Sequence, residues 1–235
     1  MVNNNSIFVV STPIGNLKDI TLRALEVLNQ VDFIICEDTR TTVNLIKHYE
    51  ISKPLISLNA VNEERKADSI IEKIKNGSSC ALVSDSGTPT ISDPGSRLIS
   101  LAIQEGIKVV PVPGASALIA ALSISGTPSN EFLFVGFLPN KKGRQKKLSE
   151  LQKINCTIIF YESVHRIEKL IGELCEFFPN RYVHVFRELT KMFEEVWRGK
   201  PYELKSQLAE KKIKGEFIVI ISPVNNSNIL HSSLE

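Results

Sequence analysis

An apolar run near the start, Ile7-Phe8-Val9-Val10, ends in the turn-forming cluster Ser11-Thr12-Pro13-Ile14-Gly15-Asn16. A short apolar run closed by Pro and Gly is typical of a buried strand followed by a loop. Residues 20–28 then place apolar side chains with helical spacing, and Asp19 is the predicted N-cap of that helix. The stretch therefore predicts a strand, a loop and a helix in that order.

The same order repeats along the first half of the chain. Apolar strands are predicted at 31–36, 55–58, 80–83 and 107–110, and helices at 41–49, 63–75, 94–105 and 117–124. Pro94 is expected in the first turn of its helix, and the helix over 117–124 is apolar nearly all round, which predicts burial. Strands with apolar residues on both faces favour a mostly parallel sheet with helices on both sides.

The second half begins after a loop-rich stretch, Ser125-Gly126-Thr127-Pro128-Ser129-Asn130. Strands are predicted there at 132–137, 157–161, 182–186, 195–199 and 217–222, and helices at 164–177 and 202–211. We therefore expect an α/β protein of two domains. Its parts are an N-terminal domain over 1–125 with a mostly parallel sheet, a C-terminal domain over 126–222 with a mixed sheet, and a disordered tail over 223–235.

Composition excludes several classes of protein. The 235 residues are 43% hydrophobic and 23% charged with a net charge of +2, which is ordinary for a globular chain and not broadly polybasic. No apolar run reaches the roughly 18 residues that span a bilayer, and the first residues show no secretion signal. The four cysteines are far apart, so we expect reduced, buried thiols in a cytoplasmic protein and no metal site.

Common catalytic signatures are missing from the sequence. The chain has no G-x-G-x-x-G, Walker phosphate loop, H-E-x-x-H or G-x-S-x-G motif, and its four histidines are scattered. These absences argue against nicotinamide, zinc and P-loop phosphoryl chemistry.

Three strand-end loops remain as candidates, at residues 11–16, 84–89 and 113–116. Ligands in parallel sheets bind beyond the carboxyl ends of the strands, and glycine lets a ligand approach the backbone. The third loop feeds the start of a helix, which favours a carboxylate or phosphate. Together the loops can hold a small zwitterion with a nucleoside, although each loop can also be a simple turn.

The order of the motifs resembles the tetrapyrrole-methylase superfamily, and within it the ribosomal RNA small-subunit methyltransferase I branch. The matching segments run from about residue 7 to 222 and include Ser11-Thr12-Pro13-Ile14-Gly15-Asn16, Glu37-Asp38-Thr39-Arg40, Ser84-Asp85-Ser86-Gly87-Thr88-Pro89, Asp93-Pro94-Gly95, Val112-Pro113-Gly114, Gly136-Phe137-Leu138-Pro139, Phe160-Tyr161-Glu162-Ser163-Val164-His165-Arg166 and Arg187-Glu188-Leu189-Thr190-Lys191. One departure is Leu58-Asn59-Ala60-Val61, where the family pattern has a histidine-containing segment.

The resemblance implies a homodimer that binds S-adenosylmethionine between two α/β domains. Such an enzyme methylates the ribose 2′-hydroxyl of a cytidine in the decoding region of small-subunit (16S) rRNA, without a metal. By the same resemblance, the residues expected to contact the cofactor are Ile14, Asp85, Thr88, Ser116 and Ala117. The residues expected to form the backbone surface under the cofactor are Pro13, Gly15, Gly87 and Gly114. Tyr161 is expected to cover the cofactor.

Four carboxylates at strand ends are candidate proton acceptors: Glu37, Asp38, Glu162 and Glu188. A carboxylate beside cations is expected to stay ionised. Nearby cations could hold RNA phosphate, namely Arg40, Arg166, Arg187 and Lys191. Two alternatives stay open. The pairs Glu37–Arg40, Glu162–Arg166 and Arg187–Glu188 can be structural salt bridges, or the proton can leave to water with no residue acting as base.

A basic segment, Lys141-Lys142-Gly143-Arg144-Gln145-Lys146-Lys147, is the candidate RNA-binding patch. In an arbitrary protein such a segment would be a solvated loop and helix start. The phenylalanines at 132, 134, 137, 160, 177 and 178 favour core positions over base stacking. The alternative functions are methylation of a tetrapyrrole or other small substrate, a non-catalytic RNA-binding module, and a nucleotide-binding regulator.

Overall fold

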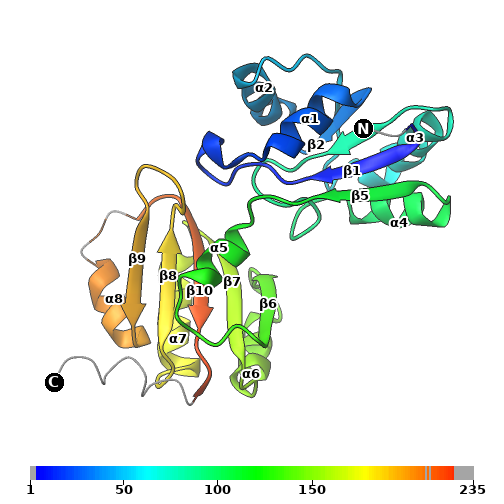
Figure 1. Cartoon of the computed structure of the whole chain (residues 1–235). Helices are drawn as coiled ribbons and strands as arrows, with labels where there is room; N and C mark the ends of the chain where they lie inside the picture. Colours follow the sequence, from blue (N-terminus) through cyan, green and yellow to red (C-terminus); the bar gives the residue numbers. More distant parts are fainter. Residues whose placement is uncertain (1–3, 210, 212, 225–235) are drawn as a thin grey trace. The chain divides into compact units, whose positions relative to one another are not determined.

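The computed structural model describes residues 4–209, 211 and 213–224 of the chain. Its contacts divide the chain into two compact units, residues 1–116 and 117–235, which are described separately below (Figure 1). The sequence prediction placed this border after residue 125. Most of the predicted tail, residues 225–235, lies outside the described residues.

The first unit is built on a five-stranded sheet. Its strands are β1 (Ser6–Val10), β2 (Phe33–Cys36), β3 (Leu55–Ser57), β4 (Cys80–Leu82) and β5 (Lys108–Val112). They lie in the order β3-β2-β4-β1-β5, and every neighbouring pair is parallel. The predicted parallel sheet is therefore confirmed, with the first strand of the chain between the fourth and the fifth.

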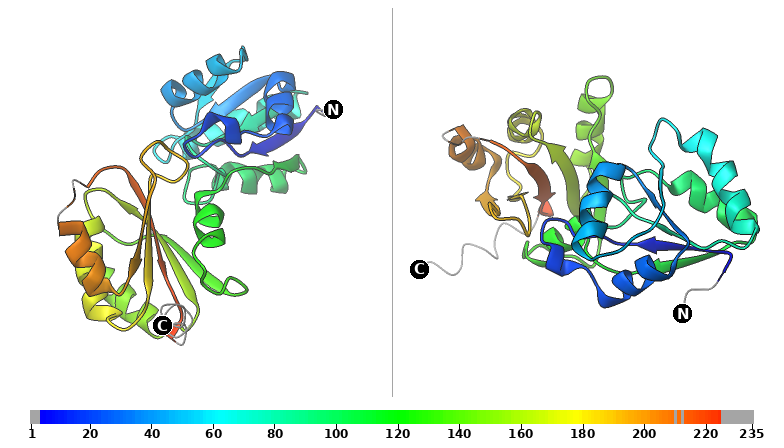
Figure 2. Two further views of the ribbon diagram at one scale, coloured as in Figure 1. Left: turned by 60° about the vertical axis from the view of Figure 1, so that its left-hand side comes forward. Right: turned by 90° about the horizontal axis from the view of Figure 1, so that it is seen from above.

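Helices cover both faces of this sheet, as Figures 1 and 2 show. Alternate residues of one strand face opposite sides, so Ile7 packs in a core with α3 (Glu63–Lys75) and α4 (Ser96–Gln104). Phe8 packs on the other side with α1 (Leu22–Gln30) and α2 (Thr39–His48). Strands buried on both faces explain the continuous apolar runs of the sequence.

Two predicted helix starts are wrong. Thr21, not Asp19, caps α1 through a hydrogen bond from the Ala24 N–H to its side chain, because residues 17–19 form a separate 3-10 turn, η1 (Leu17–Asp19). Helix α4 begins at Ser96, and Gly95 precedes it with a φ of +117°, so Pro94 lies outside the helix. A positive φ of this kind favours glycine and breaks the helical path.

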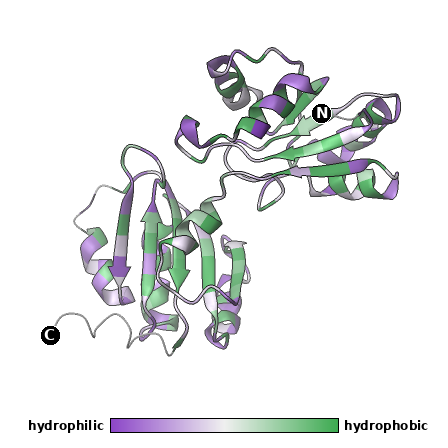
Figure 3. Ribbon diagram, in the orientation of Figure 1, coloured by the Kyte–Doolittle hydropathy of each residue, from purple (hydrophilic) through white to green (hydrophobic). Residues whose placement is uncertain are grey.

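The second unit holds a mixed sheet. Its strands are β6 (Phe132–Phe137), β7 (Thr157–Ser163), β8 (Val183–Arg187), β9 (Glu195–Gly199) and β10 (Glu216–Ile221), in the order β6-β7-β10-β8-β9. The β6–β7 pair is parallel and the other pairs are antiparallel, which confirms the predicted mixed sheet. Three helices pack on one face around an apolar core: α6 (Arg144–Gln152), α7 (Ile167–Phe177) and α8 (Pro201–Ala209). Figure 3 shows hydrophobic colour along most strands of both sheets.

Helix α5 (Ala117–Ser123) is half-buried rather than fully buried. Leu118, Ala121 and Leu122 are buried, and the helix contacts β10 of the second unit. Ile119, in contrast, is 52% exposed, so the predicted burial on all sides is wrong. The apolar composition of a helix does not reveal how many of its faces have a partner.

All four cysteines are free, as predicted, but only Cys36 and Cys80 are buried, while Cys156 and Cys175 are half-buried. Over the residues that the structure describes, no helix is long and apolar enough to cross a membrane.

Candidate functional site

The three predicted loops meet at one edge of the first sheet. They follow β1, β4 and β5, which are neighbours in the strand order β4-β1-β5. Because the carboxyl ends of parallel strands share one edge, the loops at residues 11–16, 84–89 and 113–116 leave the sheet side by side. We call these three loops the strand-end cradle.

Hydrogen bonds join the loops of the cradle directly. The Thr12 N–H donates to the Gly87 carbonyl at 2.9 Å, and the Gly87 N–H donates back to the Thr12 carbonyl at 3.1 Å. The Thr88 hydroxyl donates to the Ala115 carbonyl at 3.1 Å and lies 2.9 Å from the Ser11 hydroxyl, which therefore acts as the donor to Thr88. One threonine thus links the first loop to the third.

Two glycines allow the loops to approach this closely. A Cβ on Gly114 would lie 2.9 Å from the Ser11 Cβ, closer than carbon atoms can pack. Gly87 has a φ of +82°, and a Cβ there would lie 3.2 Å from the Ile14 side chain. Within the first loop, Pro13 and Ile14 are buried, whereas Gly15 is exposed. Of the residues predicted to form the backbone surface under the cofactor, Gly87 and Gly114 lie where the loops pack tightly against each other. Ser116 and Ala117, both half-buried, follow the third loop in the chain.

An acidic group lies at the ends of β2 and β4. The Asp38 N–H donates to the Asp85 carboxylate at 3.2 Å, which links the loop after β2 to the cradle. Partial desolvation raises the pKa of the exposed Asp85, and burial raises the pKa of the half-buried Asp93 to about 6. Burial, together with the charges of Asp85, Asp93 and Asp38, also raises the pKa of Glu37.

Asp38 is the exception in this group. Hydrogen bonds from the Arg40 side chain and backbone lower the pKa of Asp38 to about 2. The expectation that strand-end carboxylates beside cations stay ionised therefore applies to Asp38, while Glu37 lies among other carboxylates. Arg40 forms a salt bridge with Asp38 at 2.5 Å, whereas the sequence suggested a salt bridge between Arg40 and Glu37.

Two residues of this region were given no site role by sequence reasoning. Asp93 belongs to the loop after β4, and its place beside Pro94-Gly95 was the available signal. Glu63, the first residue of α3, accepts hydrogen bonds at one oxygen from the N–H groups of Gly95, Arg97 and Leu98 at 3.0–3.2 Å. It thereby ties the start of α4 to α3, a contact that has no signature in the sequence.

In the second unit, Glu162 is buried between two arginines. Its carboxylate contacts Arg166 at 2.7 Å and Arg144 at 3.3 Å, and its side chain is 0% exposed. Glu162 and Arg166 therefore form a salt bridge, which is the structural role that the sequence left open for this pair.

Arg144 is not part of an exposed RNA-binding patch, which corrects the sequence prediction. It is 1% exposed, and its guanidinium donates to both carboxylate oxygens of Glu173 at 2.8 and 3.0 Å. Lys141, Lys142 and Lys146 are exposed and Lys147 is half-buried, so the cationic surface of this segment consists of lysines. Helical spacing points Arg144 inward, as it does Leu148 and Leu151.

Glu188 also has cationic and backbone partners. Lys191 pairs with Glu188 at 3.0 Å and with Glu216 at 2.8 Å, whereas Arg187 pairs with Glu195 at 2.8 Å. Burial acts to raise the pKa of Glu188, but hydrogen bonds from the Glu216 N–H and Lys191 outweigh it, so that the pKa is lowered. Glu188 is therefore held as an anion. The sequence allowed a salt bridge between Arg187 and Glu188, but in the structure Arg187 pairs with Glu195 instead.

Tyr161 lies on β7, and its ring contacts those of Phe134 and Phe137. Within the part of the chain that the structure describes, no group of three or more His, Cys, Asp or Glu residues could hold a metal ion.

Comparisons with known proteins agree on one family. Residues 6–205 match the family model described as Tetrapyrrole (Corrin/Porphyrin) Methylases. A ribosomal RNA small subunit methyltransferase I from Thermotoga maritima is 44% identical, with 92% of this chain and 97% of that relative covered. The protein of the same name from Xylella fastidiosa is 48% identical, with coverage of 94% and 82%.

Solved structures show the same fold. The uroporphyrin-III C-methyl transferase from Thermus thermophilus, complexed with S-adenyl homocysteine, matches with a TM-score of 0.65 at 16% identity, covering 93% of this chain and 98% of that one. Diphthine synthase matches with a TM-score of 0.69 at 17% identity, covering 92% and 89%. The predicted fold class is therefore confirmed.

Proposed function

The chain belongs to the tetrapyrrole (corrin/porphyrin) methylase family, and from this premise we propose that it methylates small-subunit rRNA with S-adenosylmethionine as donor. The target that we propose is the ribose 2′-hydroxyl of a cytidine in the decoding region. The names of the similar relatives support rRNA as the substrate class. The methylated position is what the family resemblance of the motifs implies.

The strand-end cradle is the observation that carries the proposal. Its loops are joined by backbone and hydroxyl hydrogen bonds, a Cβ on Gly114 would clash with Ser11, and Gly87 holds a positive φ. A tightly joined set of strand-end loops of this kind suits a ligand that has both a charged amino-acid part and a nucleoside. S-adenosylmethionine supplies an electrophilic methyl group when bound. The chain itself must bind and orient the reactants, and the hydroxyl proton must pass either to a residue of the chain or to water.

Glu37 is the carboxylate that we propose as proton acceptor. It is half-buried at the end of β2, and burial together with neighbouring carboxylates raises its pKa, which brings a base closer to neutral pH. Glu162 and Glu188 are less suited, because arginine or lysine partners already neutralise them. Retained methylation by Glu37→Gln would instead favour loss of the proton to water.

Calorimetric titration of S-adenosylmethionine tests the cradle. We expect binding by the wild type and at least tenfold weaker binding by Gly114→Ala, because the added Cβ would displace Ser11. Gly172→Ala is the matched control, since a Cβ there meets nothing within 4 Å. A wild-type protein that takes up no donor would end the proposal.

Mass mapping of ribose methylation tests the substrate. Small-subunit rRNA from a strain lacking the protein should lack one 2′-O-methyl cytidine, and expression of the wild type should restore it. Unchanged rRNA together with methylation of a small acceptor would favour the tetrapyrrole-type alternative.

A further inference from the structure

Strand β6 contains a bulge that changes which side chains face the same way. Phe134 pairs with Ile159 and Phe137 pairs with Tyr161, but the register shifts between Phe134 and Gly136, where Gly136 has a φ of +67°. A bulge adds one residue to one strand and redirects the side chains beyond it. Phe134 and Phe137, three residues apart, therefore lie on the same face as Tyr161.

This face is opposite to the main core of the second unit. Gly136 pairs with Phe160, which is fully buried among α6, α7 and α8. The rings of Phe134 and Phe137 contact Tyr161 with centroids 5.0 and 5.8 Å apart. Phe137 is 52% exposed and Phe132 is 37% exposed, so the expectation that these two are core residues is wrong. Without the bulge, Phe137 would point into the core.

A network of ion pairs fixes the surroundings of the Phe137 ring. The Arg166 guanidinium lies over that ring at 5.8 Å, donates to the Leu138 carbonyl at 3.0 Å and to Asn140, and pairs with Glu162. Arg144 in turn contacts Glu162 and the Pro139 carbonyl. The loop after β6 is therefore held by two arginines, and a large apolar ring stays exposed on a fixed support.

Exposed cations follow the ring in the chain. Lys141 and Lys142 come directly after the loop that Arg166 holds, and both are exposed. Aromatic rings stack on unpaired bases, and neighbouring lysines bind phosphates. A protein partner would instead favour a wider apolar surface than a single exposed ring with Arg166 over it and lysines next along the chain.

We propose that Phe137 is a stacking platform for one unpaired RNA base, with Lys141 and Lys142 binding the adjoining phosphates. The inference rests on the proposed function, because it assigns a contact to the RNA substrate of that reaction. The bulge at Gly136 presents the ring, and the Arg166–Glu162–Arg144 network holds it in place.

Steady-state methylation of small ribosomal subunits, purified from a strain lacking the protein, tests the platform. Phe137→Ala and Phe137→Leu should each lower kcat/KM for subunits by roughly 5- to 150-fold, the loss expected for one stacked base. Phe137→Trp should restore it. The KM for S-adenosylmethionine and the thermal midpoint should stay at wild-type values. Phe132→Ala is the matched control, because Phe132 is 37% exposed at the other end of β6.

Each other outcome counts against the platform. Wild-type kcat/KM in Phe137→Ala would overturn it while the proposed function stands. Activity retained by Phe137→Leu but lost in Phe137→Ala would indicate an apolar contact, such as one with a ribosomal protein. A weaker affinity for S-adenosylmethionine would assign Phe137 to donor binding instead. A wild-type protein that labels no rRNA would overturn the proposed function together with the platform.

Discussion

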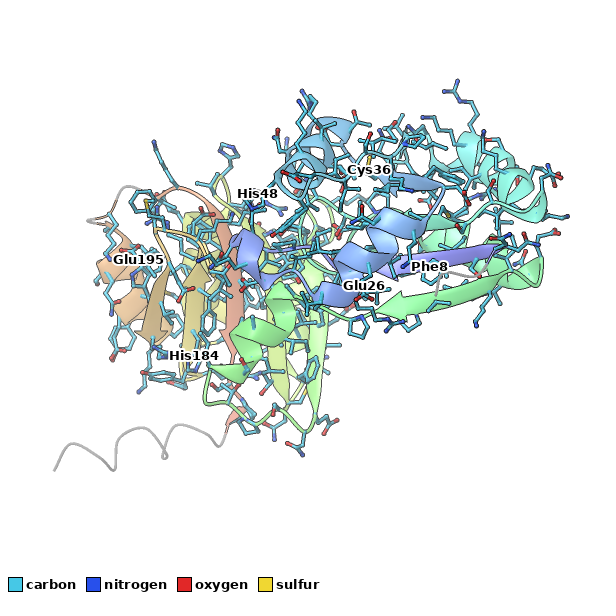
Figure 4. All side chains as sticks on the ribbon, turned by 45° about the horizontal axis from the view of Figure 1, so that its top comes forward. Phe8, Glu26, Cys36, His48, His184 and Glu195 are labelled. Carbon is cyan, nitrogen blue, oxygen red and sulfur yellow. The ribbon has the colours of Figure 1, made fainter. Side chains whose placement is uncertain are left out.

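His184 is a buried histidine within the second sheet, where Figure 4 labels it. It is 0% exposed between the rings of Tyr182 and Phe186, and among the described residues neither of its ring nitrogens has a hydrogen-bond partner. Burial, with a smaller contribution from the charge of Arg198, lowers the pKa of His184 to about 4. The side chain is therefore neutral in the folded protein near pH 7.

We expect this histidine to make the fold sensitive to mild acid. The unfolded chain takes up the proton below pH 6.5, but the folded chain does so only near pH 4, so the free energy of unfolding falls as the pH drops through this window. Protonation of His184 should lower the free energy of unfolding by about 3 kcal/mol over the whole window. Urea denaturation of His184→Leu between pH 7 and 4.5 should show a flatter pH dependence than the wild type.

The exposed His165 provides the control for this measurement. His165→Leu removes a histidine from the surface and shows whether a flatter pH dependence requires loss of the buried side chain. Parallel stability curves for His184→Leu and the wild type would contradict the prediction.

At the scale of elements, the joint between α3 and α4 organises the loop that carries Asp85, Gly87, Thr88 and Asp93. Glu63 satisfies three N–H groups around the first turn of α4, and this loop includes Thr90 and Ser92 at positive φ. Non-glycine residues at positive φ persist only where their surroundings hold them. The conformation of the loop therefore depends on a residue outside it.

Removing this carboxylate should loosen the cradle. We expect Glu63→Ala to cost about 1–2 kcal/mol of stability, as for the loss of a helix cap, and to weaken binding of S-adenosylmethionine. Glu63→Gln keeps an acceptor oxygen and should recover most of both quantities. Calorimetry and thermal denaturation measure them, and equal losses in the two variants would contradict the assignment.

Arg144 and Lys146 lie two residues apart in α6 but have different roles. We expect Arg144→Ala to lower the free energy of unfolding by about 3–5 kcal/mol, because it leaves buried carboxylates without their partner. Lys146→Ala should change it by less than about 0.5 kcal/mol, because Lys146 is exposed. Chemical denaturation checks both values, and similar losses would contradict the burial of Arg144.

The sequence predicted some elements closely and others less well for physical reasons. Helix α3 matches the predicted 63–75 because acidic residues begin it and Asn76-Gly77 ends it. Local signals of this kind could not show that Gly95 adopts a positive φ. The candidate loops were found because Pro and Gly follow apolar strands, whereas the burial of Arg144 depends on Glu162 and Glu173, far along the chain.

At the scale of the whole molecule, the net charge is only +2, so the attraction to RNA must be local. We expect joint replacement of Lys141, Lys142, Lys146 and Lys147 by alanine to weaken RNA binding and to make it less dependent on salt. For single-stranded RNA, each phosphate that no longer has a lysine partner should lower the slope of log K against log salt by about 0.7. Binding of S-adenosylmethionine should be unchanged.

Filter binding or fluorescence anisotropy at several salt concentrations measures that slope. Unchanged RNA affinity at two salt concentrations would contradict the prediction. Residues 141–147 would then be a solvated loop and helix start with no role in RNA binding.

The strand order of the first sheet has a consequence for biosynthesis. Strand β1 is made first, yet its only hydrogen-bonded neighbours in the described sheet are β4 and β5, which end at residues 82 and 112. On a translating ribosome, the nascent β1 must therefore wait without partners while β2 and β3 emerge and can pair with each other. Only when residue 112 has left the exit tunnel can β1 be enclosed, so the first strand of this sheet to be made is among the last to be locked in place.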